Sequence, residues 1–269
     1  MNPTQTITSL DLAAARHFVR LAAERRSVRS FEPGRQINRE TLELICDAGR
    51  WAPSGANTQP WELCVVHERN QLDAVAAVFA AQADRLNKHC QGFPHVHKKH
   101  WVHDAVAIIV LFADPRWQAA YPTATDPAVD AAEYGPNRTN IFLVSLGAAA
   151  QNMHLAAAAL GLSTAWLSGG GEPTTATQLR AALDVPEPFV PYATIPIGWP
   201  HRRSDSRWRR PLGEVIHWDR LDADQLRTQE DVDRYIRRER RDSIYRDATQ
   251  RAAALRTTAD EQAHGTSGC

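Results

Sequence analysis

Five short runs of β-branched and aromatic residues constrain the fold of this chain more than any other feature. Runs of this length and composition are typical of β-strands. They are Glu62–Val66, Ala105–Ala113, Ser163–Leu167, Val190–Gly198 and Glu214–Trp218. The sequence therefore predicts five strands.

Three further segments have the apolar spacing of helices. Ser9 is a suitable cap for a helix over Leu10–Glu24, and Asn38 is a suitable cap for the next one. The segment Asn140–Leu160 is rich in alanine and is followed by Gly161, a residue type that commonly ends helices. Strands and helices together indicate an α+β fold, with a sheet flanked by helices.

The composition argues against some classes of function. The 31 Lys and Arg residues balance the 31 Asp and Glu residues, so there is no electrostatic case for binding nucleic acid or an anionic membrane. No apolar run approaches the roughly 18 residues of a membrane span, and the first residues lack the pattern of a secretory signal. The four cysteines have no CxxC spacing, which indicates reduced thiols in a cytoplasmic protein.

The segment Arg50–Val66 joins a helix end to a strand through a small polar loop. This polar loop begins with Pro53, Ser54, Gly55 and Asn57. Proline fixes φ, glycine permits a close backbone approach, and the polar side chains can form hydrogen bonds. We interpret the loop as a rigid cradle for a polar, planar ligand, with an ordinary helix-to-strand connection as the alternative.

Two arginine groups are candidates for binding an anion. The first consists of Arg25, Arg26, Ser27 and Arg29, and the second of Arg207, Arg209 and Arg210. Guanidinium groups bind phosphate through paired hydrogen bonds, and a hydroxyl adds a donor. In a neutral protein, two separate groups indicate one compact anionic ligand, and a salt-bridged surface is the alternative.

A glycine segment, Trp166–Glu172, follows the third predicted strand. Its three glycines expose backbone N–H groups and admit a flat ring close to the chain. The segment is not a GxGxxG fingerprint and no Walker-type lysine follows it. A plain loop is the alternative interpretation.

Two regions of irregular composition, Arg85–His103 and Arg116–Gly135, are expected to be mobile flaps over a site. His97, His100 and His103 would share one helical face, as metal ligands do. The surrounding charge is positive, however, so we interpret the first region as a basic flap and predict no metal.

The sequence has no nucleophile or acid–base pair in a recognised motif, which indicates that a cofactor supplies the reactivity. No catalytic residue is assigned.

Taken in order, these segments resemble the nitroreductase-like FMN oxidoreductases from about Arg25 to Asp219. The resemblance is carried by R-R-S-V-R-S-F, A-P-S-G-A-N-T-Q-P-W, the alanine-rich helix, P-I-G-W-P and R-W-R-R-P-L-G-E-V-I-H-W. It implies a homodimer with FMN at the interface. It also implies a central mixed five-stranded sheet, in which the C-terminal strand, Glu214–Trp218, is exchanged between subunits. Residues 1–219 would form the FMN-binding domain, and residues 220–269 a charged helical extension with a disordered tail.

The resemblance also implies roles for the candidate residues. Arg25, Arg26, Ser27 and Arg29 would hold the phosphate and pyrimidine edge of FMN, with Arg207, Arg209 and Arg210 as a later phosphate-binding group. Pro53, Ser54, Gly55 and Asn57 would come from the other subunit, and Leu167, Ser168, Gly169 and Gly170 would face flavin N5.

The implied activity is reduction of nitroaromatic, quinone or related conjugated small molecules, with NAD(P)H as electron donor, in a ping-pong mechanism. The motifs are closest to the iodotyrosine deiodinase branch, in which Ser168 and Lys99 would match a hydroxyl near N5 and a lid lysine. That lid's glutamate and tyrosine have no counterparts between Ala80 and Gly92. The alternatives are a pathway-specific flavin-dependent dehydrogenase or oxidase, a reductive dehalogenase, and a flavin-binding protein without turnover.

Overall fold

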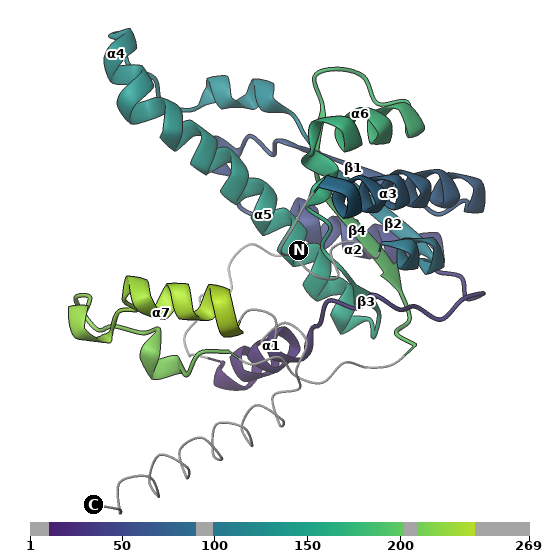
Figure 1. Ribbon diagram of the computed structural model, residues 1–269, viewed down its shortest axis with the longest axis horizontal. Coiled ribbons are helices and arrows are strands. Elements are labelled where there is room, and N and C mark those ends of the chain that lie inside the picture. The colour runs from purple at the N-terminus through teal and green to yellow at the C-terminus, as the bar shows by residue number, and fades with distance from the viewer. Residues whose placement is uncertain (1–10, 90–98, 202–208, 240–269) are drawn as a thin grey trace, which may run out of the picture. The chain divides into compact units, whose positions relative to one another are not determined.

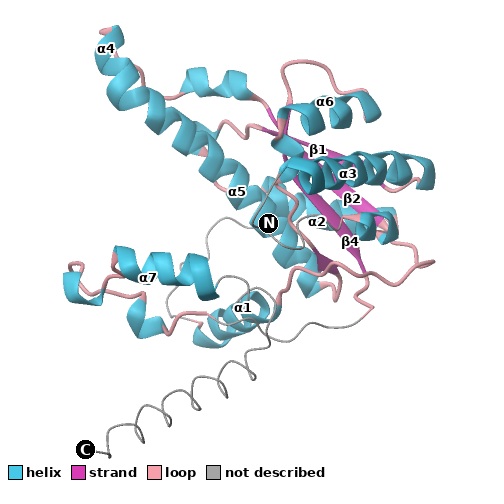
Figure 2. Cartoon of the chain, in the orientation of Figure 1, coloured by secondary structure: helices cyan, strands magenta, loops and turns pink. Residues whose placement is uncertain are grey.

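The computed structural model describes residues 11–89, 99–201 and 209–239. The chain divides into two compact units, residues 1–203 and 204–269. The first unit contains the sheet and most of the helices (Figures 1 and 2).

Four strands form one antiparallel sheet in the order β1-β2-β4-β3. They are β1 (Trp61–Val66), β2 (Ala107–Ala113), β3 (Ser163–Thr164) and β4 (Val190–Gly198). The central strand β2 has the sequence A-I-I-V-L-F-A and is buried at every position. Because alternate side chains of a strand point to opposite faces, Ile109 and Leu111 enter one core and Ile108 and Val110 the other. Helices therefore cover both faces of the sheet.

One face is covered by α2 (Arg39–Arg50) and the alanine-rich α5 (Gly135–Ala159). The predicted cap of α2 is confirmed, since Asn38 Oδ1 accepts a hydrogen bond from Thr41 N at 2.9 Å. Small residues let the two helices approach closely. A Cβ on Gly49 would lie 2.8 Å from Met153, and Asn152 Nδ2 donates to Ala48 O at 3.0 Å.

The other face is covered by α3 (Arg69–His89) and α6 (Pro173–Ala182), neither of which the sequence analysis predicted. In Figure 1, α3 crosses in front of the strands. Phe79 and Ala83 of this helix are fully buried. The helix continues past them through Arg85 to His89. The expected flap over Arg85–His103 is therefore wrong in its first part. Residues 90–98 lie outside the described residues, and His100–Asp104 form a short 3-10 helix.

The second expected flap, Arg116–Gly135, is also ordered. It contains a 3-10 helix (Pro115–Ala120), the short α4 (Pro127–Val129) and a π-helical turn (Asp130–Tyr134) that leads into α5. Arg138 holds this segment through two hydrogen bonds of 2.7 Å to the carboxylate of Asp130. The same contacts lower the pKa of Asp130 to about 2.

The sheet differs from the predicted mixed five-stranded one. The predicted strand Ser163–Leu167 pairs regularly over two residues and then through a single bridge between Leu167 and Thr194. Glu214–Trp218 is not a strand in this chain, because Leu212–Glu214 form a 3-10 helix followed by a turn. All four described strands run antiparallel, and one isolated bridge, Ser27 with Thr164, is parallel.

The helix α1 (Leu12–Glu24) is close to its predicted bounds, although its cap is Asp11, whose Oδ1 accepts from Ala14 N at 2.9 Å. Ser9 and Leu10 lie outside the described residues. None of the residues of α1 is buried. The second unit contains a 3-10 helix (Ala223–Gln225), α7 (Gln229–Arg234) and a π-helical turn (Tyr235–Glu239).

Among the described residues, one continuous helical stretch, Pro127–Ala159, is long and apolar enough to cross a membrane by length and composition alone. Half of its most apolar window is already buried inside the protein. Core helices that pack against a sheet, as α5 does, pass the same test.

Candidate functional site

The first arginine group lies along β3 and the C-terminal end of β4. Ser27 bridges to Thr164, and Val28 N donates to Thr164 O at 2.9 Å. Val28 and Phe31 are buried and fix the segment, whereas Arg29 is exposed between them. The segment therefore presents its cationic side chains from a fixed backbone.

His154 of α5 lies beneath this segment. Its Nδ1 is 2.6 Å from Thr164 Oγ1, and its ring stacks on Trp166 with centroids 5.4 Å apart. Burial, and secondly the charge of Arg25, lower the pKa of His154 to about 4. The imidazole is therefore neutral at pH 7, and its buried Nε2 has no hydrogen-bond partner among the described residues. The electrostatic effect also shows that Arg25 lies close to His154 and the start of β3.

The glycine segment continues from β3 along the neighbouring β4. Leu167 is buried and exchanges two backbone hydrogen bonds with Thr194, so it has no free backbone group. Ser168 is exposed and precedes a 3-10 helix, Gly169–Gly171. A Cβ on Gly170 would lie 3.1 Å from Leu179, so side chains pack closely against the segment.

The buried side chain of Gln82 is hydrogen-bonded to the glycine segment. Gln82 Nε2 donates to Gly169 O at 2.7 Å, and Lys99 Nζ donates to Gln82 Oε1. Arg85 lies in the same region and donates to Thr175 Oγ1 at 3.0 Å. The sequence analysis missed Gln82 because α3, which carries it, was not predicted.

The polar loop is held rigidly by hydrogen bonds from inside the protein. Gly55 N donates to Ser145 Oγ at 3.2 Å, and Gln59 N donates to Ser54 Oγ at 3.0 Å. Asn57 has a left-handed backbone with φ of 53° and an exposed side chain, and Pro53 is exposed as well. The loop therefore has hydrogen bonds that support its backbone, and Asn57 lies at the surface.

The polar loop and the first arginine group lie at opposite ends of the sheet. The loop leads into Trp61, which pairs with Ala113, and Ala113 pairs with Val190 at the start of β4. The arginine group borders Thr164, which pairs with Ile197 near the end of β4. Val190 and Ile197 are separated by about 23 Å at roughly 3.3 Å per residue. One chain therefore does not bring the two parts together.

The second arginine group belongs to the second unit. Arg209 and Arg210 are described there, and Arg207 lies outside the described residues. Arg210 pairs with Glu214, whose Oε2 is 3.6 Å from Arg210 Nε, and also donates to the Glu214 backbone carbonyl.

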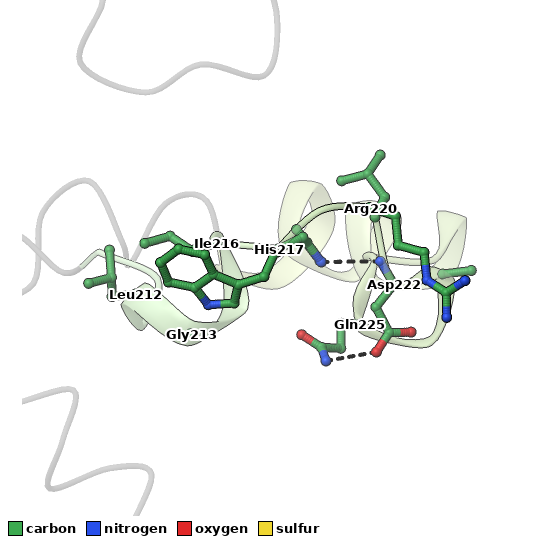
Figure 3. Close-up of a pocket in the computed structure, with 10 residues that line it drawn as sticks. Leu212, Gly213, Ile216, His217, Arg220, Asp222 and Gln225 are labelled. Carbon is green, nitrogen blue, oxygen red and sulfur yellow. Dashed lines mark hydrogen bonds between the residues drawn. The ribbon is translucent and has the colours of Figure 1, made fainter.

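The second unit also contains an open cavity of about 880 Å³ (Figure 3). Its polar wall includes Asp222, whose N–H donates to His217 Nδ1 at 3.3 Å and whose carboxylate accepts from Gln225. Its apolar wall includes Leu212 and Trp218, which are 72% and 83% exposed. Apolar side chains this exposed are typical of a surface that a partner covers.

A second groove, of about 770 Å³, lies between α2 and β1. Its charged lining residues are four carboxylates, Glu40, Glu43, Asp47 and Glu62, and one arginine, Arg50, which pairs with Asp47. The rest of the lining includes Leu44, Trp61 and Leu63. β1 is an edge strand in the described chain, so its outer backbone edge is available for pairing.

The described residues contain no group of three His, Cys, Asp or Glu side chains arranged to hold a metal ion. His97 lies outside the described residues, and His103 Nε2 is 3.1 Å from Asp73 Oδ1.

Comparisons with known proteins find similar sequences and structures. A family profile described as "Nitroreductase family" matches residues 22–199. A protein from Archaeoglobus fulgidus, provisionally named an NADH dehydrogenase/NAD(P)H nitroreductase, is 29% identical over 181 residues, which cover 67% of this chain and 84% of that protein.

Solved structures share the fold. The NADPH:FMN oxidoreductase from Vibrio harveyi complexed with NAD+ has a TM-score of 0.59 at 20% identity, and the match covers 89% of this chain and 91% of that one. An FMN-dependent nitroreductase from Clostridium difficile has a TM-score of 0.55 at 18% identity, covering 76% and 99%. At these identities the structures support the fold alone.

Proposed function

The chain belongs to the Nitroreductase family, and from this premise we propose that it is an FMN-dependent oxidoreductase that uses NAD(P)H to reduce nitroaromatic, quinone or related conjugated molecules. The observation that carries this proposal is the continuous run from the first arginine group, past β3, to the glycine segment. This run combines cations for a phosphate with an open backbone for a flat ring.

The residues present fit FMN. Arg25, Arg26 and Arg29 supply guanidinium groups and Ser27 a hydroxyl, which are the donors that a phosphate ester and a pyrimidine edge need. Ser168, Gly169 and Gly170 would lie against the ring. A Cβ on Gly169 would lie 2.3 Å from Gln82 Nε2 and one on Gly170 would lie 3.1 Å from Leu179 Cδ1, so a side chain at either position would displace its neighbour.

We propose a homodimer in which each site is completed by the partner's polar loop. Two observations support it. The polar loop lies at the opposite end of the sheet from the first arginine group, and apolar side chains such as Phe18, Val19 and Val144 are more than half exposed on α1 and α5. Pro53, Ser54, Gly55 and Asn57 would then bind the flavin of the neighbouring subunit.

The exchanged strand is part of the same proposal. Glu214–Trp218 would pair with the open edge of β1 in the partner subunit as its fifth strand. The acidic groove along that edge is complementary in charge to the basic segment that contains Arg207, Arg209 and Arg210. These arginines would thereby approach the flavin phosphate.

Arg25, Arg26, Ser27 and Arg29 would hold FMN, which would supply the hydride-transfer chemistry between NAD(P)H and the second substrate in a ping-pong sequence. The chain's contribution is binding and electrostatics. Arg29, with its fixed charge near the pyrimidine edge, would favour the anionic reduced cofactor. The N–H groups of Gly169 and Gly170 would act as donors facing N5, so no protein acid or base is assigned.

Reductive dehalogenation is the second candidate, as expected for the iodotyrosine deiodinase branch. The exposed Ser168 beside the glycine segment supports it. Lys99 argues against an amino acid clamp of that branch, because the residue is 7% exposed and its ammonium is bonded to Gln82. We therefore rank nitroaromatic and quinone acceptors first.

We also propose a cytoplasmic location and no direct binding of nucleic acid or membrane. The support is the charge balance of the chain and the free thiols of Cys46 and Cys64. Burial raises the pKa of both thiols, that of Cys46 to about 11, so neither is a reactive nucleophile.

Anaerobic spectroscopy of the purified protein tests the proposal. NADH or NADPH is expected to bleach the flavin absorbance, and a nitroaromatic or quinone is expected to restore it. If neither nicotinamide bleaches the flavin, the reductase assignment is wrong. If a halotyrosine restores the absorbance while nitroaromatics do not, the second candidate replaces the first.

A further inference from the structure

Lys99 and Gln82 form a buried polar connection beneath the glycine segment. Lys99 is 7% exposed and Gln82 is fully buried. The Lys99 ammonium donates to the Gln82 carbonyl oxygen, and the Gln82 amide nitrogen donates to Gly169 O at 2.7 Å. A positive charge is thus joined by two hydrogen bonds to a backbone carbonyl of the glycine segment. We call this the Lys99–Gln82 connection.

The burial of this lysine is not explained by stability. Removing an ammonium from water is unfavourable unless a charged partner compensates for it. Lys99 is absent from the ion pairs found in the described residues, and burial lowers its pKa. Of the nearby charges, Glu172 favours the protonated form and Arg85 opposes it. The ring of Phe79, 5.7 Å from the ammonium, is a further weak partner.

The glutamine contacts the glycine backbone directly. A Cβ on Gly169 would lie 2.3 Å from Gln82 Nε2, so the amide packs in the space that a side chain would fill. A hydrogen bond accepted by the Gly169 carbonyl polarises the Gly169–Gly170 peptide group and strengthens its N–H as a donor. That N–H belongs to Gly170. A cation at the far end of the connection adds to the same polarisation.

We propose that Lys99, acting through Gln82, is a positioning residue that orients and polarises the glycine-segment amides toward N5 of the oxidised flavin. This inference rests on the proposed function, because it takes the glycine segment as the part of the chain that faces the flavin ring. Lys99 then lies on the side of the glycine segment away from the flavin and does not contact the substrate. N5 of the flavin accepts a hydrogen bond when oxidised and carries a hydrogen of its own when reduced, so the strengthened N–H raises the affinity for oxidised FMN above that for reduced FMN.

Two single variants and their double variant test the connection. Gln82→Leu removes both hydrogen bonds, and Lys99→Met removes the charge while keeping the length of the side chain. Gln71→Leu and Lys88→Met are matched controls, since they make the same substitutions at exposed positions of α3. The midpoint potential of bound FMN gives the ratio of the affinities for the reduced and oxidised forms. Hydrogen–deuterium exchange of Ser168–Gly171 in FMN-free protein reports directly on the support of the segment.

Gln82→Leu is expected to accelerate exchange of the segment amides and to shift the affinity ratio about tenfold in favour of reduced FMN, which corresponds to about 30 mV for a two-electron couple. Lys99→Met is expected to shift the ratio in the same direction. The double variant is expected to match Gln82→Leu, because the charge acts through the amide. Both controls are expected to match the wild type.

An unchanged potential in both single variants, or additive shifts in the double variant, would overturn the inference. The exchange measurement is made on FMN-free protein, so it distinguishes failure of this inference from failure of the proposed function. If the wild-type protein binds no FMN, the proposed function fails. If Gln82→Leu leaves exchange of Ser168–Gly171 unchanged, the support itself is refuted, whether or not FMN binds.

Discussion

Substitution of Gly55 by alanine tests the packing that holds the polar loop. A Cβ at this position would lie 2.1 Å from Ile141 Cγ2 and 3.1 Å from Tyr121 Cε1, whereas ordinary contacts begin at 3.4 Å. The atoms would have to separate by roughly 1.3 Å. Ile141 lies on α5, and a β-branched side chain in a helix has one strongly preferred χ1 rotamer. The loop, and not the isoleucine, is therefore expected to move.

The expected loss of stability follows from two contacts. Overpacking of this kind is unfavourable by about 1–3 kcal/mol. Displacement of the loop also breaks the hydrogen bond from Gly55 N to Ser145 Oγ, which contributes about 1 kcal/mol. Gly55→Ala is therefore expected to lower the free energy of unfolding by about 2–4 kcal/mol. Because the loop presents Asn57, the affinity for FMN is also expected to fall.

Urea denaturation of FMN-free protein at one fixed concentration measures the effect, since bound cofactor and subunit concentration both shift apparent stability. Gly147→Ala on α5 is the matched control. Its Cβ would meet only Tyr192 OH, at 3.6 Å, so it is expected to be neutral or stabilising by up to about 1 kcal/mol. The double variant Gly55→Ala/Ile141→Ala is expected to lose less free energy of unfolding than the two single variants lose together. If Gly55→Ala is as stable as the wild type, the packing argument is refuted.

Three further outcomes are expected. The folded pKa of His154, about 4, is below its ordinary value of 6.5, so the unfolded chain binds the extra proton. Stability should then fall by about 3 kcal/mol as the pH drops from 6.5 through 4, and urea titrations of His154→Gln should show a shallower fall. Arg25→Ala should weaken FMN binding by about 2–3 kcal/mol and raise the pKa of His154, and an unchanged flavin content contradicts the phosphate assignment. Truncation after Leu212 should abolish the dimer, which sedimentation measures, and a folded monomer that retains FMN contradicts strand exchange.

Local signals in the sequence were sufficient for many elements of the fold. The strand Val190–Gly198 has its predicted bounds, and Asn38 caps α2 as expected. The alanine-rich helix is present as well, with its packing against α2. These features depend on side-chain volume, β-branching and capping, which act within a few residues of each other and are therefore readable from a sequence.

Other elements depend on partners that are distant along the chain. Helix α3 was missed although Leu72, Val75 and Phe79 have helical spacing. What its sequence does not show is the burial of Gln82, which depends on the bonds to Gly169 and Lys99. The segment Arg116–Gly135 has a loop-like composition, yet the pairing of Asp130 with Arg138 orders it. A predicted strand at Glu214–Trp218 has no partner strand within the described chain.

The sequence by itself determined the kind of site, because guanidinium groups, a hydroxyl and a run of glycines have a recognisable chemistry wherever they lie. Only the tertiary structure decided their arrangement. The pairing of Ser27 with Thr164 brings the first arginine group beside the glycine segment, whereas the register of β2 and β4 places the polar loop at the far end of the sheet. The physical reason is that strand register is set by burial of side chains on both faces of the sheet, which is a property of the whole packed core and not of any one segment.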